Sequence, residues 1–238
     1  MRILALESSA VSAGVAVCEN GIIRSESFIN NGLTHSQTLL SLADSTLRNA
    51  GLSMQDIDCL AVSAGPGSFT GIRIGVSCAK GLAFPDDKPC YGISTLEAMA
   101  WSVSNQDALI CPMMDARCNQ VYTALFRCRN NNIERLTADS AMKIDEWIVV
   151  LQEYNEKTVL IGDGVSTFCD TLVQAGIDIE LVSQASRYQH ANGVALAAWN
   201  RHSQGILPIH HEHLVPCYLR LSQAERERQN KEKGAQNK

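Results

Sequence analysis

The sequence of 238 residues lacks several features that would narrow its class at once. No apolar run approaches the roughly 20 residues of a membrane span, and the start shows no signal-peptide pattern, so we expect a cytoplasmic protein with no membrane partner. The nine cysteines include no Cys-x-x-Cys pair, and most of them stand in apolar runs. This usage is typical of reduced, buried thiols and disfavours a secreted disulfide framework.

Positive charge is also scarce, since the net charge is −5. Proteins that hold nucleic acid on their own usually carry a basic face, so we do not expect independent nucleic-acid binding. The only marked charge run, residues 225–238, carries +2 and leaves −7 on the rest of the chain. We expect this run to be a disordered, solvated tail.

One order of predicted elements occurs twice. Three strands, a helix, a strand and a second helix fill residues 2–84, and the same order recurs in residues 109–175. Alternating strands and helices predict α/β domains whose sheets are covered by helices. We therefore expect domains at 1–104 and 105–224, with a later helix at 191–203 in the second, and a cleft between them. The duplicated βββαβα plan is that of the two-domain actin-like ATPase (ASKHA) fold, which binds nucleotide in the cleft.

The run SAGPGSFTGIRIG, residues 63–75, is the densest local signal. It is not a phosphate-binding P-loop, because Gly67 and Gly71 stand four apart and Arg73 lies two residues past Gly71, whereas the P-loop has Lys directly after its second glycine. Backbone N–H groups at a helix start could still attract an anion. We favour another interpretation, in which a ridge of tiny residues lets a second helix approach closely. The ridge consists of Gly71, Gly75, Ala79 and Ala83.

Two acidic strand ends and one glycine pair are candidates for a nucleotide site. Glu7-Ser8-Ser9 keeps the acid and hydroxyls that a phosphate loop would use, whereas Asp115-Ala116-Arg117 has arginine where close backbone approach favours glycine. Gly162-Asp163-Gly164 could border an adenine pocket, and a strand-to-helix turn explains it equally well. The cluster His210-His211-Glu212-His213 suggests a metal. Because adjacent histidines on an extended segment point to opposite sides, we expect no metal site there.

Several of these motifs together resemble the TsaB family, also called YeaZ. They are ILALESS, THSQTLL at 34–40, the glycine run at 65–75, Asp115-Ala116-Arg117 with Val121-Tyr122, and Pro216-x-Tyr218-Leu219-Arg220. Glu7 departs from the Asp more usual in TsaB and is similar to the sister enzyme TsaD. The resemblance implies a noncatalytic partner of TsaD and of the ATPase TsaE. Their complex forms N6-threonylcarbamoyladenosine at position 37 of tRNAs that read codons beginning with A.

The same resemblance implies that this chain lacks the catalytic metal site of TsaD. TsaD holds its metal through a His-x-x-x-His pair, whose positions fall near Thr95 and Met99 here, so no catalytic residue and no metal site is expected. No cofactor is required; nucleotide would bind weakly or at the interface of the complex. We expect tRNA to be reached only through the complex, and a homodimer when the chain is alone. The alternatives are an ATP-using actin-like enzyme acting alone and a metallo-glycopeptidase.

Two predicted helices are candidates for the surface that meets TsaD or a second copy. The helix predicted at 35–50 carries Leu39, Ala43 and Leu47, and the helix predicted at 71–84 carries the Gly71, Gly75, Ala79, Ala83 ridge with Arg73 beside it. Two such helices from each chain would form a four-helix interface. The alternative is that both stripes face the chain's own sheet.

Overall fold

The computed structural model describes residues 1–105 and 107–220. A first sheet has the strand order β3-β2-β1-β4-β5. The β1–β2 and β2–β3 pairs are antiparallel, while β4 lies parallel to both β1 and β5. The strands are β1 (Arg2–Glu7), β2 (Ala13–Glu19), β3 (Ile22–Ile29), β4 (Cys59–Gly65) and β5 (Cys90–Ser94).

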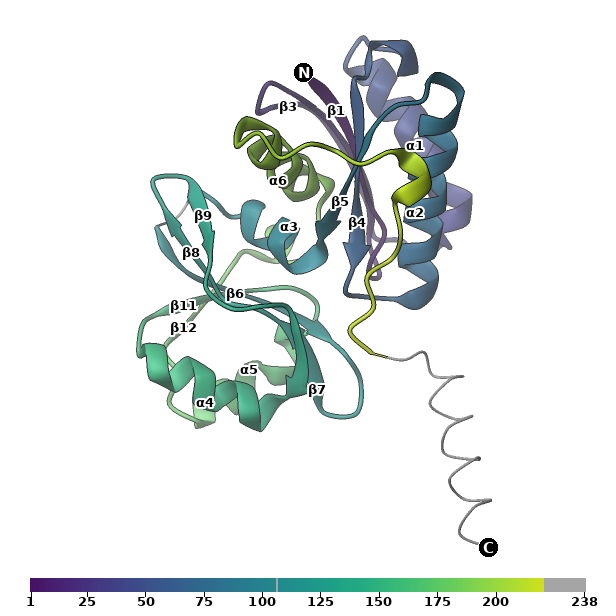
Figure 1. The fold of residues 1–238 in the computed structure, drawn as a ribbon. Helices are drawn as coiled ribbons and strands as arrows, with labels where there is room; N and C mark the ends of the chain where they lie inside the picture. The colour runs from purple at the N-terminus through teal and green to yellow at the C-terminus, as the bar shows by residue number, and fades with distance from the viewer. Residues whose placement is uncertain (106, 221–238) are drawn as a thin grey trace, which may run out of the picture.

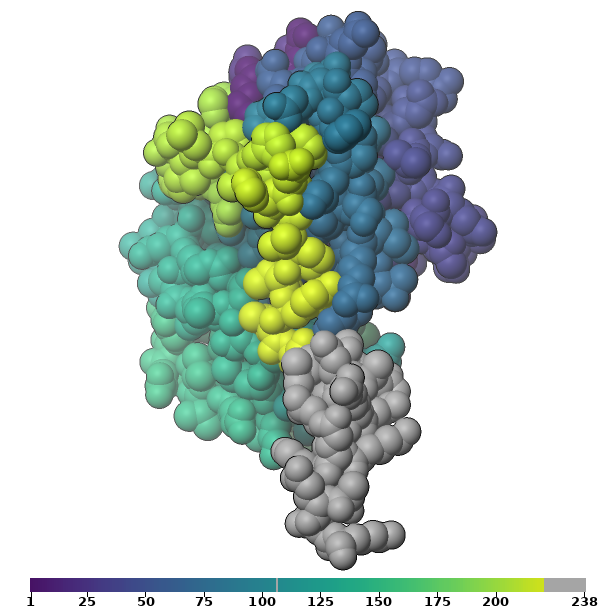
Figure 2. All heavy atoms as spheres, turned by 45° about the vertical axis from the view of Figure 1, so that its right-hand side comes forward, coloured from purple at the N-terminus to yellow at the C-terminus, as the bar shows by residue number. Residues whose placement is uncertain are grey.

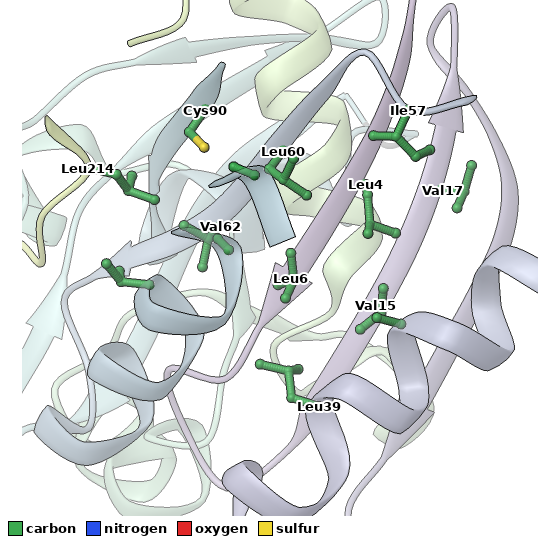
Figure 3. Packing of buried hydrophobic residues seen from close by; sticks show 14 of the residues in the cluster. Leu4, Leu6, Val15, Val17, Leu39, Ile57, Leu60, Val62, Cys90 and Leu214 are labelled. Carbon is green, nitrogen blue, oxygen red and sulfur yellow. The ribbon is translucent and has the colours of Figure 1, made fainter. Parts of the chain in front are cut away.

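Helices cover both faces of this sheet (Figure 1). Helices α1 (His35–Asn49) and α2 (Phe69–Ala83) lie on one face, and α6 (Ala191–Ser203) lies on the other beside the short α3 (Thr95–Trp101). Side chains alternate along a strand, so Leu4 and Leu6 of β1 point to the α1–α2 side and Ala5 points to α6. Figure 3 shows Leu39 of α1 beside Leu6 in the first of these cores.

The second sheet has the order β10-β7-β6-β11-β12, with β8 and β9 pairing beside β6. Helices α4 and α5 pack on one face around Trp147, Phe168 and Leu172, which are at most 2% exposed. The other face packs against α3. The elements are β6 (Ala108–Asp115), β7 (Gln120–Thr123), β8 (Phe126–Arg129), β9 (Asn132–Arg135), β10 (Ser140–Lys143), α4 (Ile144–Tyr154), β11 (Thr158–Ile161), α5 (Val165–Gln174) and β12 (Ile179–Leu181).

The predicted α/β architecture, with two sheets in an actin-like plan, is confirmed. The segment from α6 onward departs from the predicted division at 105–224. Helix α6 packs on β1 and β2, and Ile209 bridges to Cys90 of β5. Residues 191–217 therefore return to the first sheet, whose second face would otherwise be open to water. The predicted tail at 225–238 lies outside the described residues.

No helix within residues 1–105 and 107–220 is both long enough and apolar enough to cross a membrane. In the same described residues the remaining helical elements are four short 3-10 turns: η1 (Met54–Asp56), η2 (Phe84–Asp86), η3 (Gln184–Ser186) and η4 (His211–His213).

Candidate functional site

The glycine loop between β4 and α2 is packed against the chain's own backbone. Gly65 has φ +124° and Gly67 has φ +155°. A Cβ at Gly65 would collide with the carbonyl oxygen of Cys217, and one at Gly67 would collide with that of Ser9. The Ser68 N–H donates to the Ser9 carbonyl at 2.7 Å, and the Ser68 hydroxyl caps α2 by accepting from the N–H of Gly71. These donors are engaged inside the chain, so they are not a free anion site.

The ridge on α2 faces inward. A Cβ at Gly71 would collide with the Ser8 carbonyl, and one at Gly75 with the Ser8 hydroxyl. Ala79 and Ala83 are fully buried in the core beneath the helix. The prediction that this ridge receives a partner helix is therefore wrong, because the ridge packs against the chain's own interior. Its close neighbour is the segment that follows β1.

The stripe on α1 is also internal. Leu39, Ala43 and Leu47 are 1%, 2% and 8% exposed and belong to the same core as the ridge. Both stripes therefore face the chain's own sheet, which is the alternative interpretation given above. Arg73, by contrast, is exposed, and its Nε donates to the Tyr218 hydroxyl at 2.7 Å.

One side of α1, next to the loop that follows it and to Leu82 of α2, stays open in the single chain. A groove of about 340 Å³ lies there, and its lining residues are Leu40, Ala43, Asp44, Leu47, Arg48, Leu52, Ser53, Met54 and Leu82. Leu40 at its edge is 57% exposed. Two residues of the predicted partner stripe thus form part of this groove, although their side chains are buried.

Glu7 at the end of β1 is enclosed by its own neighbours. Its Oε1 accepts from both the N–H and the hydroxyl of Ser9 at 2.6 Å, and its Oε2 accepts from the Ser63 hydroxyl. Burial raises the pKa of Glu7, because the charged form loses water, although the three hydrogen bonds oppose this. Glu7, Ser8 and Ser9 are each at most 1% exposed. In this arrangement the predicted phosphate loop presents no side chain to a ligand.

The corresponding loop of the second half keeps a turned backbone without glycine. Arg117, Cys118 and Asn119 have φ of +64°, +54° and +56°. The Arg117 N–H donates to Asp115 Oδ1 at 2.7 Å, and its guanidinium lies 3.6 Å from Oδ2 of the same residue. Arg117 therefore pairs with the carboxylate of Asp115, and its backbone N–H is not free to bind a phosphate.

The Gly162–Gly164 turn meets the first half through one glutamine. Gly162 has φ +120°, and a Cβ there would collide with the Met113 carbonyl, so close packing against β6 requires this glycine. Asp163 Oδ1 accepts from Gln189 Nε2 at 2.6 Å, and the Gln189 carbonyl accepts from the Ser12 hydroxyl at 3.1 Å. Burial raises the pKa of Asp163. Sequence reasoning missed Gln189, because a single buried polar residue before a helix leaves no pattern.

The segment after η4 fastens the two halves together. The Cys217 N–H donates to the Ala64 carbonyl at 2.7 Å, Tyr218 stacks on Phe69 with ring centroids 4.4 Å apart, and Arg220 donates to the Ala116 carbonyl. We call residues 214–220 the strap; Figure 2 shows the yellow C-terminal part of the chain lying along α2. The crevice that the strap fills beside the glycine loop has no space for a water molecule.

Two mixed sheets with helices on their faces define an actin-like α/β fold, and the Glu7–Ser9 and Asp115–Arg117 loops are held by hydrogen bonds within the chain. A family model described as TsaD, tRNA N6-adenosine threonylcarbamoyltransferase, matches residues 31–228. The tRNA threonylcarbamoyladenosine biosynthesis protein TsaB of Bacillus subtilis is 31% identical over 225 residues, covering 94% of this chain and 96% of the relative. The chain belongs to the TsaB family.

Solved structures agree on the fold. A Pseudomonas aeruginosa protein described as similar to the peptidase YeaZ superposes with a TM-score of 0.80 at 24% identity, over 92% of this chain and 99% of that one. Component A of (R)-2-hydroxyglutaryl-CoA dehydratase from Acidaminococcus fermentans superposes with a TM-score of 0.52 at 11% identity, over 85% of this chain and 99% of that one. At these identities the likeness concerns the fold alone.

Proposed function

We propose that this chain takes part in tRNA threonylcarbamoyladenosine biosynthesis as a noncatalytic subunit that binds a TsaD-type transferase. It acts in the cytoplasm together with a TsaE-type ATPase and reaches tRNA only through that complex. Membership of the TsaB family supports the pathway. The noncatalytic role is supported by the burial of the residues that stand where a catalytic relative would hold phosphate or metal.

The observation that carries this role is the closed Glu7–Ser9 segment. A loop that handles a phosphate needs N–H groups and hydroxyls free to turn toward it, and here Glu7, Ser9 and Ser63 satisfy one another. Thr95 and Met99, at the positions that the family resemblance aligns with the transferase's metal ligands, are at most 1% exposed. Neither side chain is a ligand of the kind that catalytic metals use.

We place the partner surface on the open side of α1 beside α2, around the groove described above. Leu40 is 57% exposed at its edge, while Leu82 and Met54 are half-buried in its wall. An apolar groove of this kind gains stability when a partner's side chains displace its water. The same face would hold the homodimer when the transferase is absent.

Reconstitution with purified components tests the proposal. Threonylcarbamoyl transfer to tRNA is measured with TsaD and TsaE, with and without this chain, and with this chain alone. We expect product only when this chain and TsaD are both present. Product from this chain alone, or full product without it, would contradict the noncatalytic role. ATP turnover by this chain alone, undiminished by removal of every trace of TsaD, would favour an enzyme that acts independently.

A matched pair of variants tests the surface. Leu40→Asp puts a charge at the groove, and Val149→Asp makes the same change on α4, where Val149 is 56% exposed. We expect Leu40→Asp to weaken the affinity for TsaD at least tenfold, which is about 1.4 kcal/mol, and Val149→Asp to leave it unchanged. Calorimetry gives the affinity, and light scattering shows whether the homodimer is lost in parallel. Equal affinities for the two variants would place the interface elsewhere.

A further inference from the structure

Asp87 and two histidines from the C-terminal region meet beside the end of α2. Asp87 follows η2 in a left-handed conformation with φ +52°. Its Oδ1 lies 2.7 Å from His210 Nε2 and 3.3 Å from His211 Nδ1. One ligand atom from each of the three residues lies within 4.8 Å of the others. The expectation that the adjacent histidines point apart is wrong, because η4 begins at His211 and turns both rings toward Asp87.

His211 contributes a buried ring nitrogen, Nδ1, to this cluster. The residue is 6% exposed, and its Nδ1 is buried without a hydrogen-bond partner. Phe84 covers the ring with an edge contact, the centroids being 5.9 Å apart. A buried ring nitrogen without a partner costs free energy unless a proton donor or a cation completes it. Its nearest charged group is the Asp87 carboxylate.

We propose that Asp87, His210 and His211 bind a divalent transition-metal ion of the Zn²⁺ class. Two imidazole nitrogens and one carboxylate oxygen are donors that Zn²⁺ accepts at about 2.0–2.2 Å, whereas Mg²⁺ and Ca²⁺ prefer oxygen alone. Asp87 is 71% exposed and His210 is 40% exposed on their side chains, so both have freedom to close around an ion. The fourth position would belong to water.

A second carboxylate stands where it would orient one ligand. His210 Nδ1 lies 3.7 Å from Glu212 Oε2, and it accepts a 3.3 Å hydrogen bond from the Glu212 N–H. Metal binding at Nε2 would leave the ring proton on Nδ1, so the hydrogen bond from the Glu212 N–H would break and the Glu212 carboxylate would move closer to accept that proton. Metal-bound histidines commonly donate their other N–H to a carboxylate in this way.

The site would fasten the C-terminal segment to the first sheet. Lys80 Nζ on α2 donates to the carbonyls of Glu212 and Leu214, and Ile209 pairs with Cys90. Metal ligation by Asp87 would add a link between chain segments that are distant in sequence, just before the strap begins. The site's role is therefore structural, since binding to the folded chain alone raises its stability.

The test is metal binding by the full chain after chelator treatment. Calorimetry with Zn²⁺ should give one ion per chain at this site and a higher Tm, and Mg²⁺ should give neither. Co²⁺ should report nitrogen and oxygen ligands, without the thiolate charge-transfer absorption that binding at the free cysteines would produce. Absence of stoichiometric Zn²⁺ binding, or a site with thiolate absorption only, would overturn the proposal.

Two ligand variants and one control variant test Asp87 and His210 as ligands. Asp87→Asn and His210→Gln alter exposed side chains, so we expect both proteins to fold and to bind Zn²⁺ at least tenfold more weakly, with the metal-dependent rise in Tm lost. His213→Gln changes an exposed histidine of the same turn, and we expect its affinity to stay within twofold of the parent chain. Unchanged affinity in Asp87→Asn, or an equal loss in His213→Gln, would contradict this set of ligands.

Discussion

Replacing Gly75 by alanine adds one methyl group to the side of α2 that touches the segment after β1. The new Cβ would overlap the Ser8 hydroxyl and lie 3.2 Å from Val62 Cγ2. Ser8 would have to rotate and break its 3.0 Å hydrogen bond to the Gly71 carbonyl. Overpacking costs about 1–3 kcal/mol and the lost bond about 0.5–1.5 kcal/mol. Alanine returns about 1 kcal/mol through its higher helix propensity, so we expect a net loss of roughly 0.5–3.5 kcal/mol.

Gly81 of the same helix is the matched control. It is exposed, and a Cβ there meets nothing within 4 Å. Gly81→Ala should therefore gain about 0.5–1 kcal/mol from helix propensity alone. The difference between the two variants isolates the steric cost at Gly75 from the backbone effect that both share.

The free energy of unfolding is measured in urea and by thermal melting, where about 1 kcal/mol shifts Tm by roughly 2–4 °C for a chain of this length. A double-mutant cycle with Ser8→Ala should recover part of the loss, because it removes the hydroxyl that the new methyl group overlaps. TsaD affinity per folded molecule should not change. The reasoning is refuted if Gly75→Ala is as stable as Gly81→Ala, or if its main effect is on TsaD affinity.

Three further outcomes follow. Burial raises the pKa of Glu7 above its value of about 4.3 in the unfolded chain. The contribution of protonated Glu7 to the stability of the fold is therefore fully present below that unfolded pKa, and it is lost as pH rises through the folded pKa. Glu7→Gln should therefore gain stability relative to the parent chain between pH 4 and pH 8 in urea titrations, and parallel pH curves would contradict this. Tyr218→Phe removes the hydrogen bond to Arg73 and should cost about 0.5–1.5 kcal/mol of stability. Tyr218→Ala also removes the stacking on Phe69 and should cost about as much again. Equal Tm values for the two variants would show that the stacking contributes nothing to stability. The isolated chain should bind tRNA at about 10⁻⁴–10⁻⁶ M, and nanomolar binding in a filter assay at physiological salt would show that it needs no partner for tRNA.

The sequence patterns predicted the elements of the first half well. The predicted helix 35–50 is α1 at His35–Asn49, and the first of the three strands predicted from residue 2 is β1 at Arg2–Glu7. These patterns work because the period of apolar residues depends on local geometry, which differs between helix and strand. The i+4 spacing of Gly71 and Gly75 likewise identified a place of close approach.

The same patterns could not say which chain or which sheet supplies the neighbour. Spacing on α2 is identical whether Gly75 meets a partner helix or the Ser8 hydroxyl, because both require only a missing side chain. Helix α6 is rich in small residues, so its sequence fits either sheet, and only the long return of the chain decides that Ala195 and Ala198 lie on the first. At His210 and His211 the extended alternation fails because a short turn replaces it.

Since α6 completes the first sheet, that sheet is finished by residues that are synthesised late. Its strands end at Ser94, and the helix that covers Ala5, Ala16 and Ala61 begins only at Ala191. At about 5–20 residues per second, a ribosome takes roughly 5–20 seconds to make the intervening chain. Throughout that interval the part of this face that α6 covers lies open to water, and apolar surface of this kind is what chaperones bind. Folding of the first half is thus coupled to synthesis of the second, and a chain cut before α6 would be an unfinished sheet rather than a smaller domain.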